Sequence, residues 1–249
     1  MRTIYSVVIL MFVFSLFCAR SIAIQCDVNS LPDMQKIQHM LSDKNNLTWV
    51  FTGDSITQGA KHTYGMRDYT ELFSERVRWE MLRKRDIVIN TGMSGSTSED
   101  LLSDIDWRVL RFKPDIVFLM IGTNDCTGGE VKTSIFRKNL TEIIKTIRRN
   151  NAILILNTPT PISSSCDPKR SSLPAYIQVI RDLSKEHNVV LIDQWLYWGK
   201  QYPNEDSKMS LLADAIHPNQ FGHRMIANTI FKSLNIYDSN SPTCKFFIP

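Results

Sequence analysis

The sequence predicts a single-domain α/β protein with a parallel β-sheet covered by helices on both faces. Short apolar segments rich in β-branched residues alternate along the chain with longer amphipathic segments. This alternation is typical of β-α-β units, which build parallel sheets buried between helices. No internal repeat, low-complexity tract or change in composition interrupts the pattern. The chain is therefore expected to form one domain without an internal linker.

The pattern places five strands and at least five helices along the chain. Strands are expected near residues 49–52, 86–90, 115–121, 152–157 and 189–193. Between the first two strands, apolar residues recur at helical spacing and charged residues fill the other face: Tyr69, Leu72, Phe73, Val77 and Met81. Comparable helices fit residues 99–111, 131–149, 174–187 and 219–234.

Residues 1–23 have the composition of a secretory signal peptide. Arg2 gives the positive start, an apolar run extends to Cys18, and small residues precede the expected cleavage site after Ala23. We therefore expect a secreted protein with residues 24–249 as its domain. An uncleaved membrane anchor is the alternative, although the apolar run is shorter than the roughly 20 residues that span a bilayer.

The net charge argues against a nucleic-acid partner. Of 29 Lys and Arg, Arg2 and Arg20 lie in the predicted signal peptide, so 27 remain against 25 Asp and Glu, a balance of +2. The basic clusters at 83–85 and 148–149 fall at predicted helix ends, where cations complement the helix dipole. Neither cluster has the long basic run or interleaved aromatic residues of a nucleic-acid surface.

Cysteines and glycosylation triplets also fit an exported protein. Four cysteines follow the predicted cleavage site: Cys26, Cys126, Cys166 and Cys244. An even number suggests disulfides. A zinc site is the alternative, but no C-x₂-C pair occurs among them, and we expect no metal. Two Asn-x-Thr triplets, at Asn46 and Asn139, would accept glycans if the host exports through an endoplasmic reticulum.

Polar segments occur where the strands end. The carboxyl ends of parallel strands meet at one edge of a sheet, so these segments should lie together. They are GDSITQG with Ser55 after the first strand, NTGMSGST with Gly95 after the second, GTND with Asn124 after the third, and DAIHPN with Asp214 and His217 before the last helix.

These residue types fit acyl transfer to a serine nucleophile. A serine hydroxyl needs a base to take its proton, and His217 can serve if Asp214, three residues before it, orients the imidazole. The oxyanion of the tetrahedral intermediate needs hydrogen-bond donors. The backbone N–H groups of Ser55 and Gly95 and the side chain of Asn124 are candidates. Gly95 suits this role because a backbone without Cβ can approach a ligand closely.

The four segments resemble, in order, the four conserved blocks of the SGNH hydrolases, also called the GDSL family of esterases and lipases. The resemblance covers most of the chain after the predicted signal peptide. It implies that Ser55 is the nucleophile of a triad with Asp214 and His217. It also implies that Gly95 and Asn124 complete the oxyanion hole with the Ser55 amide. The family fold is a flavodoxin-like three-layer α/β/α sandwich with five parallel strands in the order 2-1-3-4-5.

Other polar residues near these segments are interpreted as structural. Ile56 stands where the eponymous motif has leucine, and the G-x-S-x-G elbow of the α/β-hydrolases is absent. Asp54 is expected to cap the turn after the first strand, and Asp125 to support Asn124. The other four histidines have no partner pattern and are expected at the surface: His39, His62, His187 and His223.

Three aromatic residues are candidates for substrate binding. Tyr64 lies in the loop after the nucleophile, and Trp198 and Tyr202 lie in the aromatic segment after the fifth strand. Trp and Tyr suit sugars because they combine a flat apolar body with a polar edge. Trp195, in the same segment, is expected to pack in the core.

The function that the sequence predicts is a secreted serine esterase that needs no metal or organic cofactor. The segments GDSITQG and HPNQFGH look most like the acetylesterase branches of the family, which implies short O-acetyl esters on carbohydrate. A lipase or lysophospholipase acting on longer acyl chains is one alternative. A catalytically silent glycan-binding relative is another, although it would have no reason to keep all five residues of the site.

The strand order implied by the resemblance suggests a disulfide pairing. Cys126 and Cys166 follow neighbouring strands, and Cys26 and Cys244 lie near the two ends of the predicted domain, which often meet at the surface. We therefore expect the pairs Cys26–Cys244 and Cys126–Cys166. Four cysteines allow three connectivities, and the other two remain open.

Overall fold

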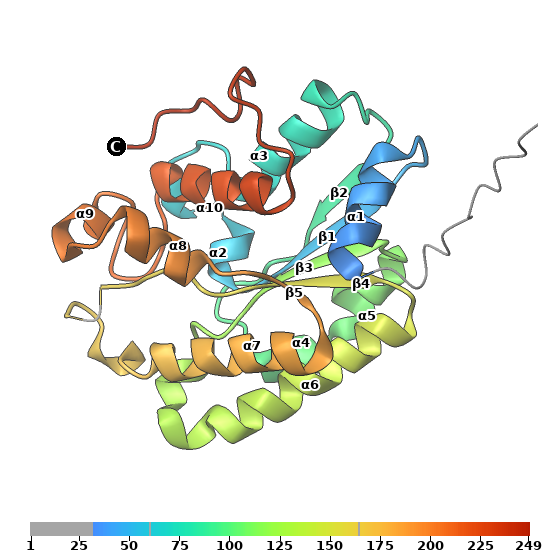
Figure 1. Ribbon diagram of the computed structural model, residues 1–249. Helices are drawn as coiled ribbons and strands as arrows, with labels where there is room; N and C mark the ends of the chain where they lie inside the picture. Colours follow the sequence, from blue (N-terminus) through green and yellow to red (C-terminus); the bar gives the residue numbers. More distant parts are fainter. Residues whose placement is uncertain (1–31, 60, 164) are drawn as a thin grey trace, which may run out of the picture. The chain divides into compact units, whose positions relative to one another are not determined.

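The computed structural model describes residues 32–249 except 60 and 164, and it confirms the predicted sheet (Figure 1). Its five strands are β1 Thr48–Gly53, β2 Ile87–Asn90, β3 Ile116–Met120, β4 Ile153–Asn157 and β5 Val190–Ile192. They are all parallel and lie in the order β2-β1-β3-β4-β5. The order 2-1-3-4-5 is thus confirmed. Residues 1–23, the predicted signal peptide, lie outside the described residues.

Helices cover both faces of the sheet, as Figure 1 shows. One face carries α4 Ser98–Ser103, α5 Ile105–Arg108, α6 Thr133–Arg149 and α7 Leu173–His187. The other carries α1 Asp33–Ser42, α3 Tyr69–Ser74 and α10 Gln220–Ser233. Three short helices lie beyond the carboxyl ends of the strands: α2 Ser55–Gln58, α8 Gln194–Gln201 and α9 Glu205–Met209. The predicted three-layer sandwich is therefore correct.

The sheet separates two apolar cores because successive strand residues point to opposite faces. In β1, Trp49 and Phe51 point toward α3 and α10, whereas Val50 points toward the face covered by α4 to α7. Phe51 stacks on Phe118 of β3, with ring centroids 4.3 Å apart, and Phe73 packs edge-on against both Trp49 and Phe51. This packing fixes β1, from which the nucleophile-bearing turn leaves the sheet.

The helices depart from the prediction in three places. The helix expected at 99–111 is divided into α4, α5 and a 3₁₀ turn, Leu110–Phe112, because Asp104 and Val109 leave helical dihedral angles. The helix expected from Tyr69 continues from α3 as a π-helix, Glu75–Glu80. The sequence analysis missed α1, α8 and α9. α8 contains Trp, Tyr and Gly, which are weak helix formers, and α1 and α9 have no side-chain N-cap.

The predicted Cys126–Cys166 disulfide is absent from the structure, where both residues are free thiols. Cys126 is buried in the core under α6 and α7, and its thiol donates to the carbonyl oxygen of Thr123 at 3.1 Å. Cys166 is exposed on the loop after β4. Burial raises the pKa of Cys126 to about 12. Cys244 is a buried free thiol, and its predicted partner Cys26 lies outside the described residues, so that pairing stays a prediction.

The two candidate glycosylation sites differ in access. Asn46 is exposed before β1. Asn139 is half-buried in α6, and its side-chain amide donates to the Ser98 hydroxyl at 3.2 Å. Asn46 is therefore more accessible than Asn139, and glycosylation of either residue stays a prediction.

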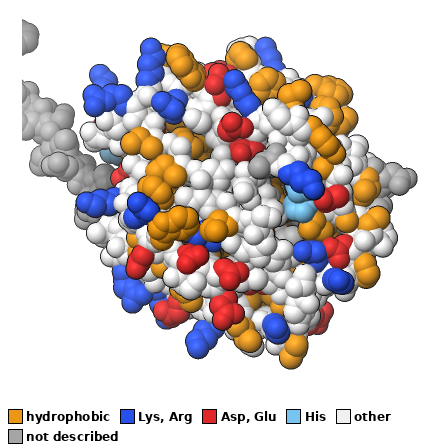
Figure 2. Space-filling view, turned by 180° about the vertical axis from the view of Figure 1, so that it is seen from behind, with side chains coloured by type: hydrophobic (Ala, Val, Ile, Leu, Met, Phe, Trp, Pro, Cys, Tyr) orange, Lys and Arg blue, Asp and Glu red, His pale blue; other side chains and the backbone are white. Residues whose placement is uncertain are grey.

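The surface in Figure 2 carries interspersed acidic and basic side chains, with apolar side chains in small groups between them. This distribution agrees with the nearly balanced charge expected from the sequence. Within residues 32–249, no helix is both long enough and apolar enough to cross a membrane.

Candidate active site

Ser55 is the first residue of α2 and follows β1 directly. The preceding residue, Asp54, is fully buried and accepts the N–H of Ile56 at 2.9 Å, which confirms its predicted capping role. Burial raises the pKa of Asp54 to about 6, although the Ile56 N–H opposes this shift. The half-buried Ser55 hydroxyl lies 2.9 Å from Nε2 of His217.

Asp214 and His217 lie on one tight turn between α9 and α10. An antiparallel bridge between Leu212 and Pro218 closes the turn, and the N–H of Ala213 donates to the His217 carbonyl at 2.8 Å. Inside it, the Asp214 carboxylate accepts the backbone N–H of His217 at 2.8 Å and contacts Nδ1 of the same residue at 2.8 Å. The backbone therefore holds the carboxylate against the ring.

These contacts determine the tautomer of His217. A carboxylate can only accept, so Nδ1 carries a proton and Nε2 is left as an acceptor for the Ser55 hydroxyl. Asp214 is 46% exposed, and partial burial alone would raise its pKa. The N–H groups of Ile216 and His217, together with the His217 ring, outweigh this effect and hold the pKa of Asp214 below its usual value.

The loop after β2 brings Gly95 to the same edge. Gly92 packs so closely on α2 that an added Cβ would lie 2.3 Å from the Gln58 nitrogen. The N–H of Ser94 donates to the Gln58 side chain at 2.9 Å. Gly95 itself has a φ of +81°, which favours glycine, and a Cβ placed there would meet no atom within 4 Å. Gly95 is therefore an exposed residue in a loop that packs on α2 through Gly92 and Ser94.

Asn124 follows β3, which pairs with β1 along the edge opposite to β2. Its Nδ2 donates to the carbonyl of Ser96 at 3.0 Å, and its Oδ1 accepts from Nη2 of Arg170 at 3.1 Å. Nε of Arg170 also donates to the Thr123 carbonyl at 2.8 Å. A guanidinium can only donate, so it fixes which end of the Asn124 amide is oxygen. One Nδ2 hydrogen then remains beside the Gly95 loop.

Asp125 joins the Gly95 and Asn124 loops. Its carboxylate accepts the backbone N–H of Ser98 at 2.9 Å and the Ser98 hydroxyl at 2.5 Å. Burial raises the pKa of Asp125, and the two Ser98 hydrogen bonds oppose that shift. These two hydrogen bonds are consistent with the predicted role of Asp125 in supporting Asn124.

Arg108 is a fully buried residue that the sequence analysis did not single out. It donates to the Gly53 carbonyl at 2.6 Å, to the Ser96 hydroxyl at 2.9 Å and to the Thr91 carbonyl at 3.1 Å. These contacts tie the end of β1 to the Gly95 loop. The only signal in the sequence was a charged residue on the apolar side of the helix expected at 99–111.

His62 is a second missed residue, for which no spacing pattern gave a signal. It lies in a 3₁₀ turn, Lys61–Thr63, and stacks on His217 with ring centroids 3.7 Å apart and planes 4° apart. Its Nε2 is 3.4 Å from the Asp214 carboxylate. Burial and the neighbouring His217 lower the pKa of His62, whereas Asp214 opposes this effect. His62 is therefore neutral at neutral pH.

His62, Asp214 and His217 could each offer a ligand atom to a metal ion, and these atoms lie within 4.8 Å of one another. The two rings lie in parallel planes, so no single ion can lie in the plane of both imidazoles, where their nitrogen lone pairs point. Chelation would require one ring to turn away from the stack. The arrangement as it stands suits a hydrogen-bonded relay better than a metal site.

The structure corrects the expectation for Trp198, which is fully buried in the core and cannot contact a substrate. Trp195 packs against the core, as expected, but is only partly buried and also lines a cavity. Tyr202 donates its hydroxyl to the Pro249 carbonyl at 2.5 Å. Tyr64 is 69% exposed in the loop after α2. Its substrate role stays a prediction, as does that of Tyr202.

His223 was also placed wrongly. It is buried in α10, and its Nδ1 accepts the backbone N–H of Tyr69 at 3.2 Å. It therefore joins α10 to α3. His39 and His187 lie outside the buried core, as expected.

A serine, a histidine and a carboxylate in hydrogen-bonded sequence at the carboxyl edge of a parallel α/β/α sheet define a serine hydrolase of the esterase class. The chain belongs to the GDSL-like Lipase/Acylhydrolase family, whose model matches residues 51–225.

Individual relatives and solved structures resemble this chain over most of its length. The chain is 30% identical to the uncharacterized lipoprotein YqeF of Bacillus subtilis (strain 168) over 175 residues, which cover 59% of this chain and 70% of YqeF. It is 26% identical over 207 residues to an acetylxylan esterase of Geobacillus stearothermophilus, covering 74% and 92% of the two chains. The solved structure of the acetyl xylan esterase AlAXEase is 26% identical, with a TM-score of 0.64, and the match covers 75% and 99% of the two chains.

Proposed function

We propose that this protein is an exported serine esterase that removes short acyl groups, above all acetyl, from carbohydrate. The observation that carries the proposal is the continuous contact from Ser55 through His217 to Asp214, at 2.9 Å and 2.8 Å. Such a chain of contacts raises the nucleophilicity of the serine because the imidazole can take its proton.

In this mechanism, the Ser55 oxygen attacks the ester carbonyl while Nε2 of His217 takes its proton. Asp214 stabilises the imidazolium that forms. The N–H groups of Ser55 and Gly95 and the free Nδ2 hydrogen of Asn124 donate to the oxyanion. The intermediate collapses by breaking the ester C–O bond, and His217 protonates the departing alcohol. Water, deprotonated by His217, then attacks the acyl-Ser55 ester and releases the acid.

The preference for acetyl esters of carbohydrate rests on the relatives. Two of them are named as acetylxylan esterases. The match to the family model, over residues 51–225, includes the segments that carry Ser55, Asn124 and His217. The absence of any atom within 4 Å of a Cβ placed on Gly95 is compatible with this proposal.

Export is supported by the charge and apolar pattern of residues 1–23 and by a relative that is itself named as a lipoprotein. Cleavage after Ala23 belongs to the same proposal. N-terminal sequencing of the protein recovered from a culture medium would test it, and an N-terminus upstream of Ala23 would contradict the cleavage site.

The activity test compares p-nitrophenyl esters of two to eight carbons and acetate release from acetylated xylooligosaccharides. We expect kcat/KM to fall as the acyl chain lengthens and acetate to appear from the glycan. In a site built for long chains, each buried methylene would instead add up to about 0.8 kcal/mol of binding, so activity that climbs with chain length would assign a lipase.

The matched control is Ser55→Ala, which removes one oxygen atom. It should lose both turnover and labelling by a fluorophosphonate probe. A wild-type protein that binds glycan but neither labels with the probe nor hydrolyses any of the esters would assign the silent relative instead.

A further inference from the structure

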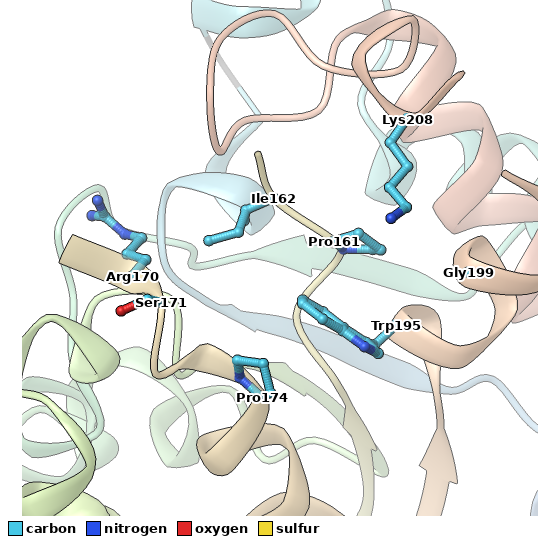
Figure 3. A pocket seen from close by; sticks show the side chains of 8 residues that line it. All are labelled: Pro161, Ile162, Arg170, Ser171, Pro174, Trp195, Gly199 and Lys208. Carbon is cyan, nitrogen blue, oxygen red and sulfur yellow. The ribbon is translucent and has the colours of Figure 1, made fainter. Parts of the chain in front are cut away.

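A cavity of about 270 Å³ lies between the loop after β4, the start of α7 and helices α8 and α9 (Figure 3). Its lining combines one indole ring with apolar and polar side chains: Pro161, Ile162, Arg170, Ser171, Pro174, Trp195, Gly199 and Lys208. In Figure 3, Trp195 and Pro174 enclose one end, and Arg170 and Ile162 lie at the other. No residue of the proposed triad is part of this lining.

Two contacts place the cavity next to the proposed active site. Arg170, which lines it, donates to Oδ1 of Asn124 at 3.1 Å. The loop that supplies Ile162 is joined to the His217 turn, because the N–H of Ser163 donates to the Ala215 carbonyl at 2.8 Å. The cavity therefore borders both the Asn124 loop and the turn that carries the base.

The backbone that carries Trp195 is held at the start of α8. The backbone N–H of Trp195 donates to the Thr158 hydroxyl at 3.0 Å, and Asp193 caps the first turn of α8 through the N–H of Leu196 at 2.9 Å. A fixed backbone at this position reduces the conformational entropy that is lost when a ligand stacks on the side chain.

The lining matches a sugar ring better than an acyl chain. A pyranose has an apolar face, which suits an indole, and a rim of hydroxyl groups, which suits Ser171 and the Arg170 guanidinium. The volume is slightly below the range of drug-sized ligand pockets, roughly 300 to 1,000 Å³, so it suits one small ring. An acyl chain would match the indole but would make no use of the Ser171 hydroxyl.

We propose that this cavity binds a sugar ring of the alcohol part of the substrate, one subsite away from the ester under attack. The inference rests on the proposed function. It assigns Trp195, not Trp198 or Tyr202, as the aromatic residue that recognises the glycan.

The test compares two acetyl substrates in paired variants. Trp195→Ala should lower kcat/KM for acetylated xylooligosaccharides about tenfold, or 1.4 kcal/mol, and leave p-nitrophenyl acetate within about twofold of wild type. Trp107→Ala, which removes an indole 58% exposed on α5, is the matched control and should change neither substrate.

A second variant adds a side chain to the cavity lining and removes no side chain that packs against others. A Cβ added to Gly199 would meet no atom within 4 Å, and leucine is a better helix former than glycine. Gly199→Leu should therefore fold, reproduce the selective loss on the glycan and spare p-nitrophenyl acetate. Gly199→Ala, which adds only the Cβ, should stay near wild type.

The outcomes separate this proposal from the proposed function. Acetate release by the wild type with equal losses on both substrates, or with no loss in Gly199→Leu, would overturn the sugar subsite alone. A selective loss on p-nitrophenyl octanoate would also overturn it, by assigning the cavity to an acyl chain. A wild type that releases acetate from neither substrate would overturn the proposed function together with the subsite.

Discussion

The two sides of the candidate active site are held in different ways. On the oxyanion side, Asn124 is bound through both ends of its amide, and its loop is tied to the Gly95 loop by Asp125 and Ser98. On the base side, Asp214 is 46% exposed, and its turn is held by local contacts, by the stacked ring of His62 and by one hydrogen bond from the Ser163 N–H to the Ala215 carbonyl. The oxyanion side depends mainly on hydrogen bonds between loops, and the base side mainly on a short turn.

In the proposed mechanism, the two sides stabilise different charges, the negative charge of the oxyanion and the positive charge of the imidazolium. The donors to an oxyanion must be in place before charge develops, and fixed donors cost no reorganisation during the reaction. The imidazole has to accept and return a proton, and the partly exposed carboxylate lets solvent share the positive charge. Substitutions on the two sides should therefore produce effects of different size and different pH dependence.

The largest effect is expected from Asp214→Asn. An amide can present either a donor or an acceptor to Nδ1, so the variant favours the wrong tautomer and should lower kcat by about 10⁴. The measurement is steady-state hydrolysis of p-nitrophenyl acetate. A loss below tenfold would mean that the turn backbone alone orients the imidazole.

Asn124→Ala should lower kcat by about 10² to 10³ and leave KM nearly unchanged, because it removes one oxyanion donor. The fold should survive, since the other contacts of the two loops do not use this side chain. Circular dichroism provides the control. A variant with wild-type kcat would remove Asn124 from the mechanism.

Asp54→Asn tests the charge buried on the oxyanion side. The pKa of Asp54 is raised from 3.8 to about 6 in the folded protein. The wild type therefore loses stability as pH rises from about 4 through 6, whereas the amide does not ionise and can still accept the Ile56 N–H. Relative to wild type, the variant should gain up to about 3 kcal/mol by pH 7.5. Urea unfolding at pH 4 and 7.5 measures this gain, and a gain independent of pH would contradict the prediction.

Arg170→Gln should lower kcat by roughly ten- to 100-fold, because the Asn124 amide loses the charged donor that fixes its orientation. Arg170→Lys keeps the charge but cannot reach Asn124 and Thr123 together, so we expect only partial rescue. The two variants are compared on p-nitrophenyl acetate. Equal activity of both with wild type would show that Ser96 alone positions Asn124.

The smallest effect concerns His62. His62→Ala should lower kcat a few fold, because an aromatic pair contributes about 0.5 to 1.5 kcal/mol, whereas His62→Phe keeps a flat ring and most of the activity. On acidification, protonation of His62 places a positive charge beside His217. Activity of the wild type should therefore fall more steeply with decreasing pH than that of His62→Phe. Parallel pH profiles would contradict this.

The strands and the residues of the proposed triad were predictable because their signals are local. Apolar runs set the strands, and the four polar segments follow them in an order that the topology brings together. Asp214 and His217 needed only a three-residue spacing. The individual helix boundaries were less predictable where capping residues were absent, as in α1 and α9.

The supporting residues of the site were not predictable in the same way. Arg108, Arg170 and His62 act through partners that are 46 to 55 residues away or on another loop, such as Gly53, Asn124 and Asp214. Their roles depend on contacts between segments that are far apart in the sequence, and a spacing pattern does not reveal such contacts. The burial of Trp198 was missed for the same reason, because helix α8 was not predicted and its faces could not be assigned.

The hydrogen bond between Ser55 and His217 joins residues 162 positions apart, whereas Asp214 and His217 are three apart. A chain made from its N-terminus presents the serine early and its base late. The helix that follows the base, α10, packs on α3, where His223 accepts the Tyr69 N–H. Contacts of such high sequence separation carry a loop-closure cost that must be met before they stabilise the fold. We therefore expect hydrolytic activity to appear only once both ends of the domain are in place.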